Sequence, residues 1–120
     1  MGKSQDEEGR KMRVLRHIVM WKFLPEAEGK SREENMKIVE ERLKSLVGIV
    51  PTLLKLEIGI DECHTPASYD MALICTHHDV QGMKAYREHP AHVEVMKYIH
   101  KVISDRVTSD IFVEDESIED

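Results

Sequence analysis

The sequence has few aromatic residues and no surplus of positive charge. Phe, Trp and Tyr make up 5% of the chain, and 17 Lys and Arg stand against 23 Asp and Glu, a formal net charge of −6. Proteins that bind nucleic acid present basic stripes interleaved with aromatic side chains. We therefore expect no nucleic-acid partner.

Long apolar runs, secretion signals and cysteine frameworks are also missing. No run of apolar residues approaches the roughly 20 needed to cross a bilayer, and the first residues hold neither an apolar h-region nor a small-residue cleavage site. Gly2 suggests myristoylation, but Asp6 occupies the position that requires Ser or Thr. Cys63 and Cys75 form no CxxC pair, which is typical of reduced thiols. We expect no membrane partner, no disulfide and a cytoplasmic location.

The chain has the size of one domain with charged ends. Its 120 residues are enough for a single core. Residues 1–12 are predicted to form a disordered N-terminal tail, and residues 115–120 an acidic C-terminal tail, because both are nearly free of apolar patterning. The ordered domain is expected to span residues 13–114.

Four segments have the composition of strands. Residues 13–23 and 69–77 are apolar on both alternating sets of positions, which predicts strands covered on both faces. Residues 53–60 alternate, with Leu54, Leu56, Ile58 and Ile60 on one side, as in a half-buried strand. Residues 105–114 are predicted to form the last strand.

Three helices are expected between these strands. Ser31 and Glu34 form a capping box, followed by one apolar stripe made of Met36, Val39, Leu43, Leu46, Val47 and Val50. Asp79 can cap a second helix, in which Val80, Met83 and Tyr86 form a ridge. Pro90 ends that helix at His89 and begins a third, whose apolar face is His92, Val95, Met96, Ile99 and Ile103.

This order of elements predicts an α+β fold of the ferredoxin-like, split βαβ type, with a four-stranded antiparallel sheet. The helices can cover only one face of that sheet, yet two of its strands are apolar on both faces. A bare second face would expose a large apolar patch. We therefore expect a homodimer that packs sheet against sheet as a dimeric α+β barrel.

His92 and Tyr86 are the candidate functional residues. An imidazole on an apolar helix face has a lowered pKa and could stay neutral and accept a proton from a carbon acid, while the Tyr86 phenol could donate to a developing enolate. His17, on the first strand, could face the same cavity. A structural reading stands beside this one, in which His92 satisfies a loop carbonyl and Tyr86 fills core volume.

A metal site is less well supported. His89 and His92 lie three residues apart, but two histidines across a proline break do not make a zinc site, and His64 lies elsewhere. His77 and His78 at a strand end are expected to be solvated. We expect no metal ligand and no cofactor.

Five segments resemble the stress-responsive dimeric α+β barrel (Dabb) family, in the family's order along residues 13–114. They are "RHIVMWKF", "EENMKIVEERLKSLVGIVPTLLKLEIGI", "SYDMALIC", "AYREHPAHVEVMKYI" and "DRVTSDIF". The resemblance implies a ferredoxin-like protomer in a dimeric barrel. It also implies a divalent ion held by backbone carbonyls in some plant members, near residues 45–48 here.

The same resemblance implies two kinds of function. Many members have no assigned activity, so the first expectation is a homodimer whose apolar cavity binds a small apolar ligand without turnover. The family also includes olivetolic acid cyclase, which folds a linear polyketide thioester into an aromatic acid. Its catalytic histidine falls on His92, its pocket tyrosine on Tyr86 and a first-strand histidine on His17. The alternative expectation is a polyketide cyclase-like enzyme or related lyase with His92 as general base.

Overall fold

Four long strands form one antiparallel sheet in the order β4-β5-β1-β6. The computed structural model describes residues 12–119, so the predicted N-terminal tail lies outside the described residues except for Met12. The strands of the sheet are β1 (Met12–Phe23), β4 (Lys55–Ile60), β5 (Met71–His77) and β6 (Ile103–Asp115). A short hairpin precedes the first helix, and its two strands, β2 (Glu26–Ala27) and β3 (Lys30–Ser31), have two residues each.

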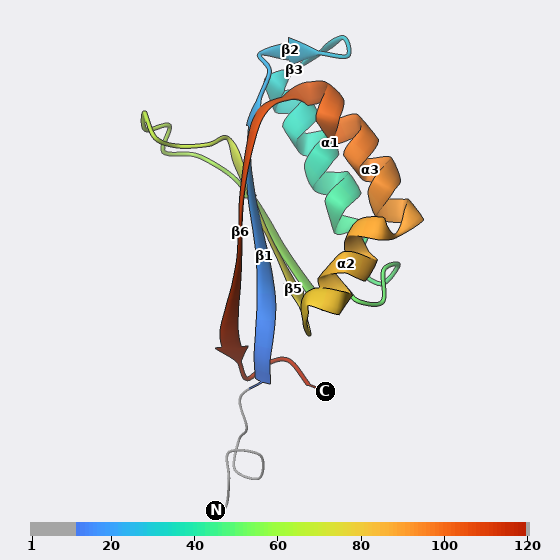
Figure 1. Cartoon of the computed structure of the whole chain (residues 1–120). Helices are drawn as coiled ribbons and strands as arrows, with labels where there is room; N and C mark the ends of the chain where they lie inside the picture. The colour runs from blue at the N-terminus through green and yellow to red at the C-terminus, as the bar shows by residue number, and fades with distance from the viewer. Residues whose placement is uncertain (1–11, 120) are drawn as a thin grey trace, which may run out of the picture.

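All helices lie on one face of this sheet, and the other face is bare (Figure 1). The helices are α1 (Arg32–Lys44), α2 (Val80–Glu88) and α3 (Pro90–Val102). This is the ferredoxin-like α+β fold that the order of elements predicted. No helix within residues 12–119 is long and apolar enough to cross a membrane.

β1 lies between β5 and β6 and has two different faces. From residue 15 on, its odd-numbered side chains face the helices and are buried: Leu15, His17, Val19, Trp21 and Phe23. On the other side Ile18 is half-buried and Met20 is 37% exposed. The alternation of a strand thus supplies both the core beneath the helices and an apolar open face.

Helix α1 begins as predicted but ends earlier. The Ser31 hydroxyl accepts from the Glu34 amide and the Glu34 carboxylate accepts from the Ser31 amide, which completes the capping box. The helix ends at Lys44, and Gly48 takes a left-handed φ of 87°. The predicted stripe is therefore wrong at Val47, which is 51% exposed, because the helical phase is lost after Ser45.

The break at Pro90 is also where the sequence placed it. His89 has an extended backbone (φ −63°, ψ 133°) and ends α2, and Pro90 is the first residue of α3. The His89 Nδ1 accepts from the Ala91 amide at 3.0 Å, so this side chain caps α3. Ile103, predicted on the apolar face of the third helix, is instead the first residue of β6.

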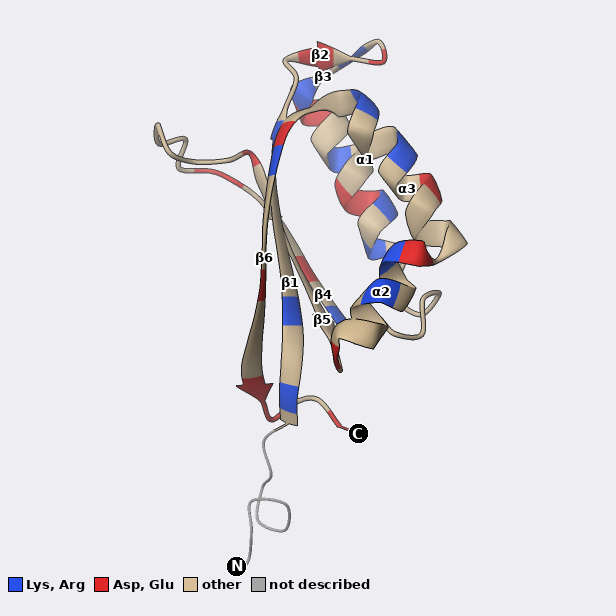
Figure 2. Ribbon diagram, viewed as in Figure 1, with Lys and Arg blue, Asp and Glu red and all other residues tan. Residues whose placement is uncertain are grey.

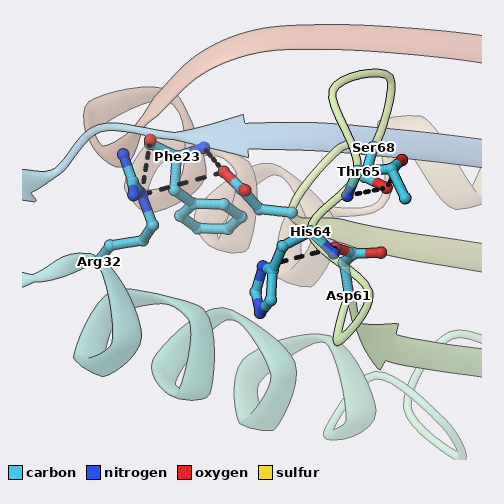
Figure 3. A network of polar contacts seen from close by, with 7 residues as sticks. Phe23, Arg32, Asp61, His64, Thr65 and Ser68 are labelled. Atoms are coloured by element: carbon cyan, nitrogen blue, oxygen red, sulfur yellow. Dashed lines mark hydrogen bonds and ion pairs between the residues drawn. The ribbon is translucent and has the colours of Figure 1, made fainter.

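A loop from Asp61 to Asp70 extends beyond the open face of the sheet (Figure 1). Figure 3 shows how it is tied to the domain: the Asp70 carboxylate accepts from the Phe23 amide at 2.7 Å and lies 4.0 Å from Arg32 Nε. Within the loop, the Asp61 carboxylate accepts from the His64 amide at 2.8 Å. These bonds give the loop a defined shape.

Charged residues recur along α1 and α3 and are also found on the strands (Figure 2). Lys, Arg, Asp and Glu alternate on the outward surfaces of α1 and α3, whereas the middle of the sheet is drawn largely in the colour of uncharged residues. Ion pairs such as Lys44–Glu40 and Lys97–Glu94 lie on those helix surfaces. On the open face, register places Arg16 and Lys22 of β1 at either end of an apolar centre that includes Ile18 and Met20.

Candidate functional site

A narrow pocket lies between the helix-facing side of the sheet and the α2–α3 junction. Its polar lining is His17, Tyr86, Arg87, His92 and Arg106, and its apolar lining includes Val19, Trp21, Leu43, Leu73 and Met96. The space within it is about 30 Å³, room for a water molecule or two. Because Arg87 and Arg106 are exposed, the pocket reaches the surface beside them.

β1 carries His17 into this pocket, and β6 supplies its partner. Register places Asp110 opposite His17, and the Asp110 Oδ1 lies 2.5 Å from His17 Nδ1. An ionised carboxylate can only accept, so Nδ1 carries the hydrogen and a neutral His17 has its lone pair on Nε2. His17 is 5% exposed, which leaves Asp110 to fix its orientation.

His92 is held by its own helical junction. It is the third residue of α3, and its Nδ1 lies 3.1 Å from the Arg87 carbonyl, to which it donates. Burial lowers the pKa of His92, and the positive charges of Arg87 and Arg106 act in the same direction. At neutral pH the imidazole is therefore uncharged, with Nε2 free to accept a proton.

Tyr86 lies beside His92 at the end of α2. The two ring centroids are 4.4 Å apart, and Tyr86 is 1% exposed. The Cys75 thiol donates to the Tyr86 hydroxyl oxygen at 3.6 Å. Burial raises the pKa of Tyr86, and it raises the pKa of Cys75 to about 11. Both groups stay protonated at neutral pH, so the Tyr86 hydroxyl keeps a hydrogen to donate.

The three candidate residues thus come together from β1, α2 and α3. The bond from His92 to the Arg87 carbonyl is also what the structural reading described, because it ties the helical break together. The two readings use different ring nitrogens, so both can hold. His89 takes no part in the pocket, since its side chain caps α3.

Sequence reasoning was wrong about His77 and missed three charged residues. His77 is fully buried, donates from Nδ1 to the Thr52 carbonyl at 2.7 Å, and lies 5.0 Å from the Tyr86 ring. The alternation of β5 carried the signal, because His77 shares a side with Leu73 and Cys75. Asp110 and Arg106 were not identified, since only the fold brings them to His17 and His92. Arg87 was also missed, although it lies close to His92 in the sequence.

The part of the chain that the structure describes has no cluster of side chains that could hold a metal ion. Within residues 12–119, no three His, Cys, Asp or Glu side chains are grouped as a metal site would require. Cys63 is exposed, Cys75 is buried, and both are free thiols.

Comparison with known proteins agrees with the fold. The chain has 22% identity to a dimeric ferredoxin-like protein of unknown function from Bacteroides fragilis, over 82% of this chain and 94% of that one, with a TM-score of 0.72. It has 16% identity to a Dabb family protein from Mesorhizobium loti, over 83% and 96%, with a TM-score of 0.66. It has 19% identity to a hydroxynitrile lyase from Passiflora edulis, over 83% and 93%, with a TM-score of 0.69.

At these identities the solved structures establish the fold and nothing finer. A search of curated proteins finds no match. The profile of the Dabb family, described as the stress responsive A/B barrel domain, matches residues 15–113, which begin within β1 and end within β6. The chain therefore belongs to the stress-responsive A/B barrel (Dabb) family.

Proposed function

We propose that this Dabb protein is a homodimer in which each protomer binds a small ligand in the pocket of His17, Tyr86 and His92. The observation that carries the proposal is the convergence of these side chains from β1, α2 and α3 around one opening. Ligand pockets combine an apolar wall with a few orienting polar groups, and Trp21 and Leu43 are part of such a wall here.

The small size of the pocket limits the ligand. A space of about 30 Å³ admits only a small group unless side chains move. Arg87 and Arg106 are exposed and long, so rearrangement at the mouth is easier than in the buried floor at Trp21. We infer a ligand whose small head enters the pocket while the remainder lies at the mouth.

The homodimer is supported by the open face of the sheet. Its apolar side chains are Val14, Ile18, Met20, Ile74, Val107, Ile111 and Val113, which share one side by strand register. Met20, Val107 and Ile111 are 37%, 36% and 42% exposed in a single chain. A second copy would remove this patch from water, and the Bacteroides fragilis neighbour is described as dimeric.

We also infer a reducing location such as the cytoplasm, because Cys63 is an exposed free thiol.

A second candidate is an enzyme with His92 as general base, of the polyketide cyclase or lyase kind. It is favoured by the neutral His92 imidazole, whose Nδ1 is occupied by the Arg87 carbonyl and whose Nε2 is free. Tyr86 could donate its hydroxyl hydrogen to an enolate oxygen formed as His92 takes the proton. Another neighbour in fold is named as a hydroxynitrile lyase.

One experiment separates the two candidates. Wild type, His92→Ala and Tyr86→Phe are screened by ligand-observed NMR against small neutral and charged fragments, and are assayed with β-polyketo thioesters and hydroxynitriles. Binding that both variants weaken, without turnover, supports the ligand-binding function. Turnover that His92→Ala lowers by about 10²-fold or more supports the base. A wild type that binds no fragment contradicts the ligand pocket.

A further inference from the structure

Three of the polar residues around the pocket, Tyr86, Arg87 and Arg106, offer hydrogen-bond donors. The guanidinium groups of Arg87 and Arg106 have donors only, and the Tyr86 hydroxyl has a hydrogen left because its oxygen already accepts from Cys75. No Asp or Glu within residues 12–119 lines the pocket. A molecule that fills it can accept from these donors, and Nε2 of His17 and of His92 can accept from it in turn.

A buried donor without a partner points the same way. Trp21 lines the pocket and is 1% exposed, yet no acceptor within residues 12–119 reaches its buried Nε1–H. A buried N–H group without an acceptor is costly, so such groups usually meet water or a ligand atom. An acceptor atom of a bound molecule within reach of this Nε1–H would supply the missing bond.

The net charge at the opening is positive. Within residues 12–119, no carboxylate lies at ion-pair distance from Arg87 or Arg106, whereas Arg16 is paired with Asp115 at 2.7 Å. The nearby Asp110 carboxylate is occupied by His17. The two guanidinium groups are thus available to a ligand, and arginine is suited to carboxylates because its planar fork can hold both oxygens.

We propose that the pocket binds the anion of a short-chain oxo acid, with its carboxylate at Arg87 and Arg106 and its ketone oxygen toward the donors of Trp21 and Tyr86. This inference rests on the proposed ligand-binding function and adds the chemical class of the ligand. It does not require turnover. A short-chain acid also suits the small volume of the pocket, because only the ketone end of the acid enters the buried floor.

The test compares two probes of nearly the same shape. The 3-oxobutanoate anion and the neutral pentane-2,4-dione differ in a carboxylate against an acetyl group. Binding is measured by isothermal titration calorimetry and ligand-observed NMR at pH 7.5. We expect 3-oxobutanoate to bind at least 10-fold more tightly than the dione, and the difference to shrink at 0.5 M salt because exposed ion pairs are screened.

Substitution of Arg87 and Arg106 tests whether these two residues cause the preference for the anionic probe. Arg87→Gln and Arg106→Gln together should remove the preference for 3-oxobutanoate, so that the two probes bind with affinities within about 2-fold of each other. Lys84→Gln, on the exposed side of α2, is the matched control for loss of a positive charge and should change neither probe's affinity. Thermal unfolding of each variant checks that it is folded.

The other outcomes overturn the inference in distinct ways. If the dione or another neutral fragment binds as well as 3-oxobutanoate, the pocket binds ligands but does not select acids, and the proposed function survives alone. If the double variant keeps the preference, the anion binds elsewhere. If neither probe nor any neutral fragment binds, the ligand-binding function itself fails.

Discussion

At the scale of single residues, burial decides what each histidine can do. His64 is exposed, His17 is buried against the Asp110 carboxylate, and His77 is buried with only the Thr52 carbonyl as partner. Burial lowers the pKa of His77, and the opposing effects of the Thr52 carbonyl and of the Asp110 and Asp79 carboxylates do not outweigh it. Residue type alone thus gave no measure of function.

The buried neutral His77 should make stability depend on pH. Its folded pKa lies below the unfolded value of about 6.5, so the unfolded chain binds more protons between these two values. Stability is therefore fully present above pH 6.5 and is lost as the pH falls below it. Urea unfolding between pH 8 and pH 5 should show the free energy of unfolding falling steadily below pH 6.5.

His77→Asn keeps a donor for the Thr52 carbonyl but cannot titrate, so this variant should be less stable at pH 8 and have a shallower loss below pH 6.5. His92 has a lowered pKa as well, and it should account for the loss that remains. His64→Asn, at an exposed position, is the control and should keep the wild-type slope. Equal slopes for His77→Asn and wild type would contradict the assignment.

At the scale of elements, local signals worked where one element's own residues decide the outcome. The capping box at Ser31, the Asp79 cap and the break at Pro90 are all local, and each is found where the pattern placed it. The end of α1 was misjudged because Leu46 and Val50 are buried from a turn rather than from a helix. An apolar spacing of four residues therefore did not require a helix there.

Because α1 ends at Lys44, the neighbouring residues Leu46 and Val47 differ in their exposure to solvent. Leu46 is 1% exposed in the core and Val47 is 51% exposed. Leu46→Ala should lower the free energy of unfolding by about 2–5 kcal/mol, whereas Val47→Ala should change it by less than about 0.5 kcal/mol. Urea unfolding of both variants at pH 7.5 checks this. A comparable loss for Val47→Ala would mean that the stripe continues past Lys44 after all.

At the scale of the whole molecule, a single chain leaves the open face of the sheet uncovered. The helices cover one side of the sheet, and Ile18, Ile74 and Ile111 remain on the other side (Figure 1). Arg16 and Lys22 lie on the same side of β1, at either end of this apolar centre. Association of two copies is the physical expectation.

Charge on the open face should separate the two copies. Met20→Glu together with Ile111→Glu places carboxylates in the proposed interface, so sedimentation velocity at about 10 μM should give a dimer for wild type and a monomer for this variant. Ile49→Glu is the control, because Ile49 is 55% exposed on the turn after α1, and it should stay dimeric. A monomeric wild type would end the homodimer proposal.

The sequence by itself determined the elements, their order and the inward direction of His92, because caps, proline breaks and apolar alternation act over a few residues. Only the tertiary structure decided which charges surround that histidine. Asp110 meets His17 through the register of β6 on β1, and Arg106 reaches the pocket through the same pairing. Strand register between segments far apart in the chain depends on packing of the whole sheet, and no local pattern encodes it.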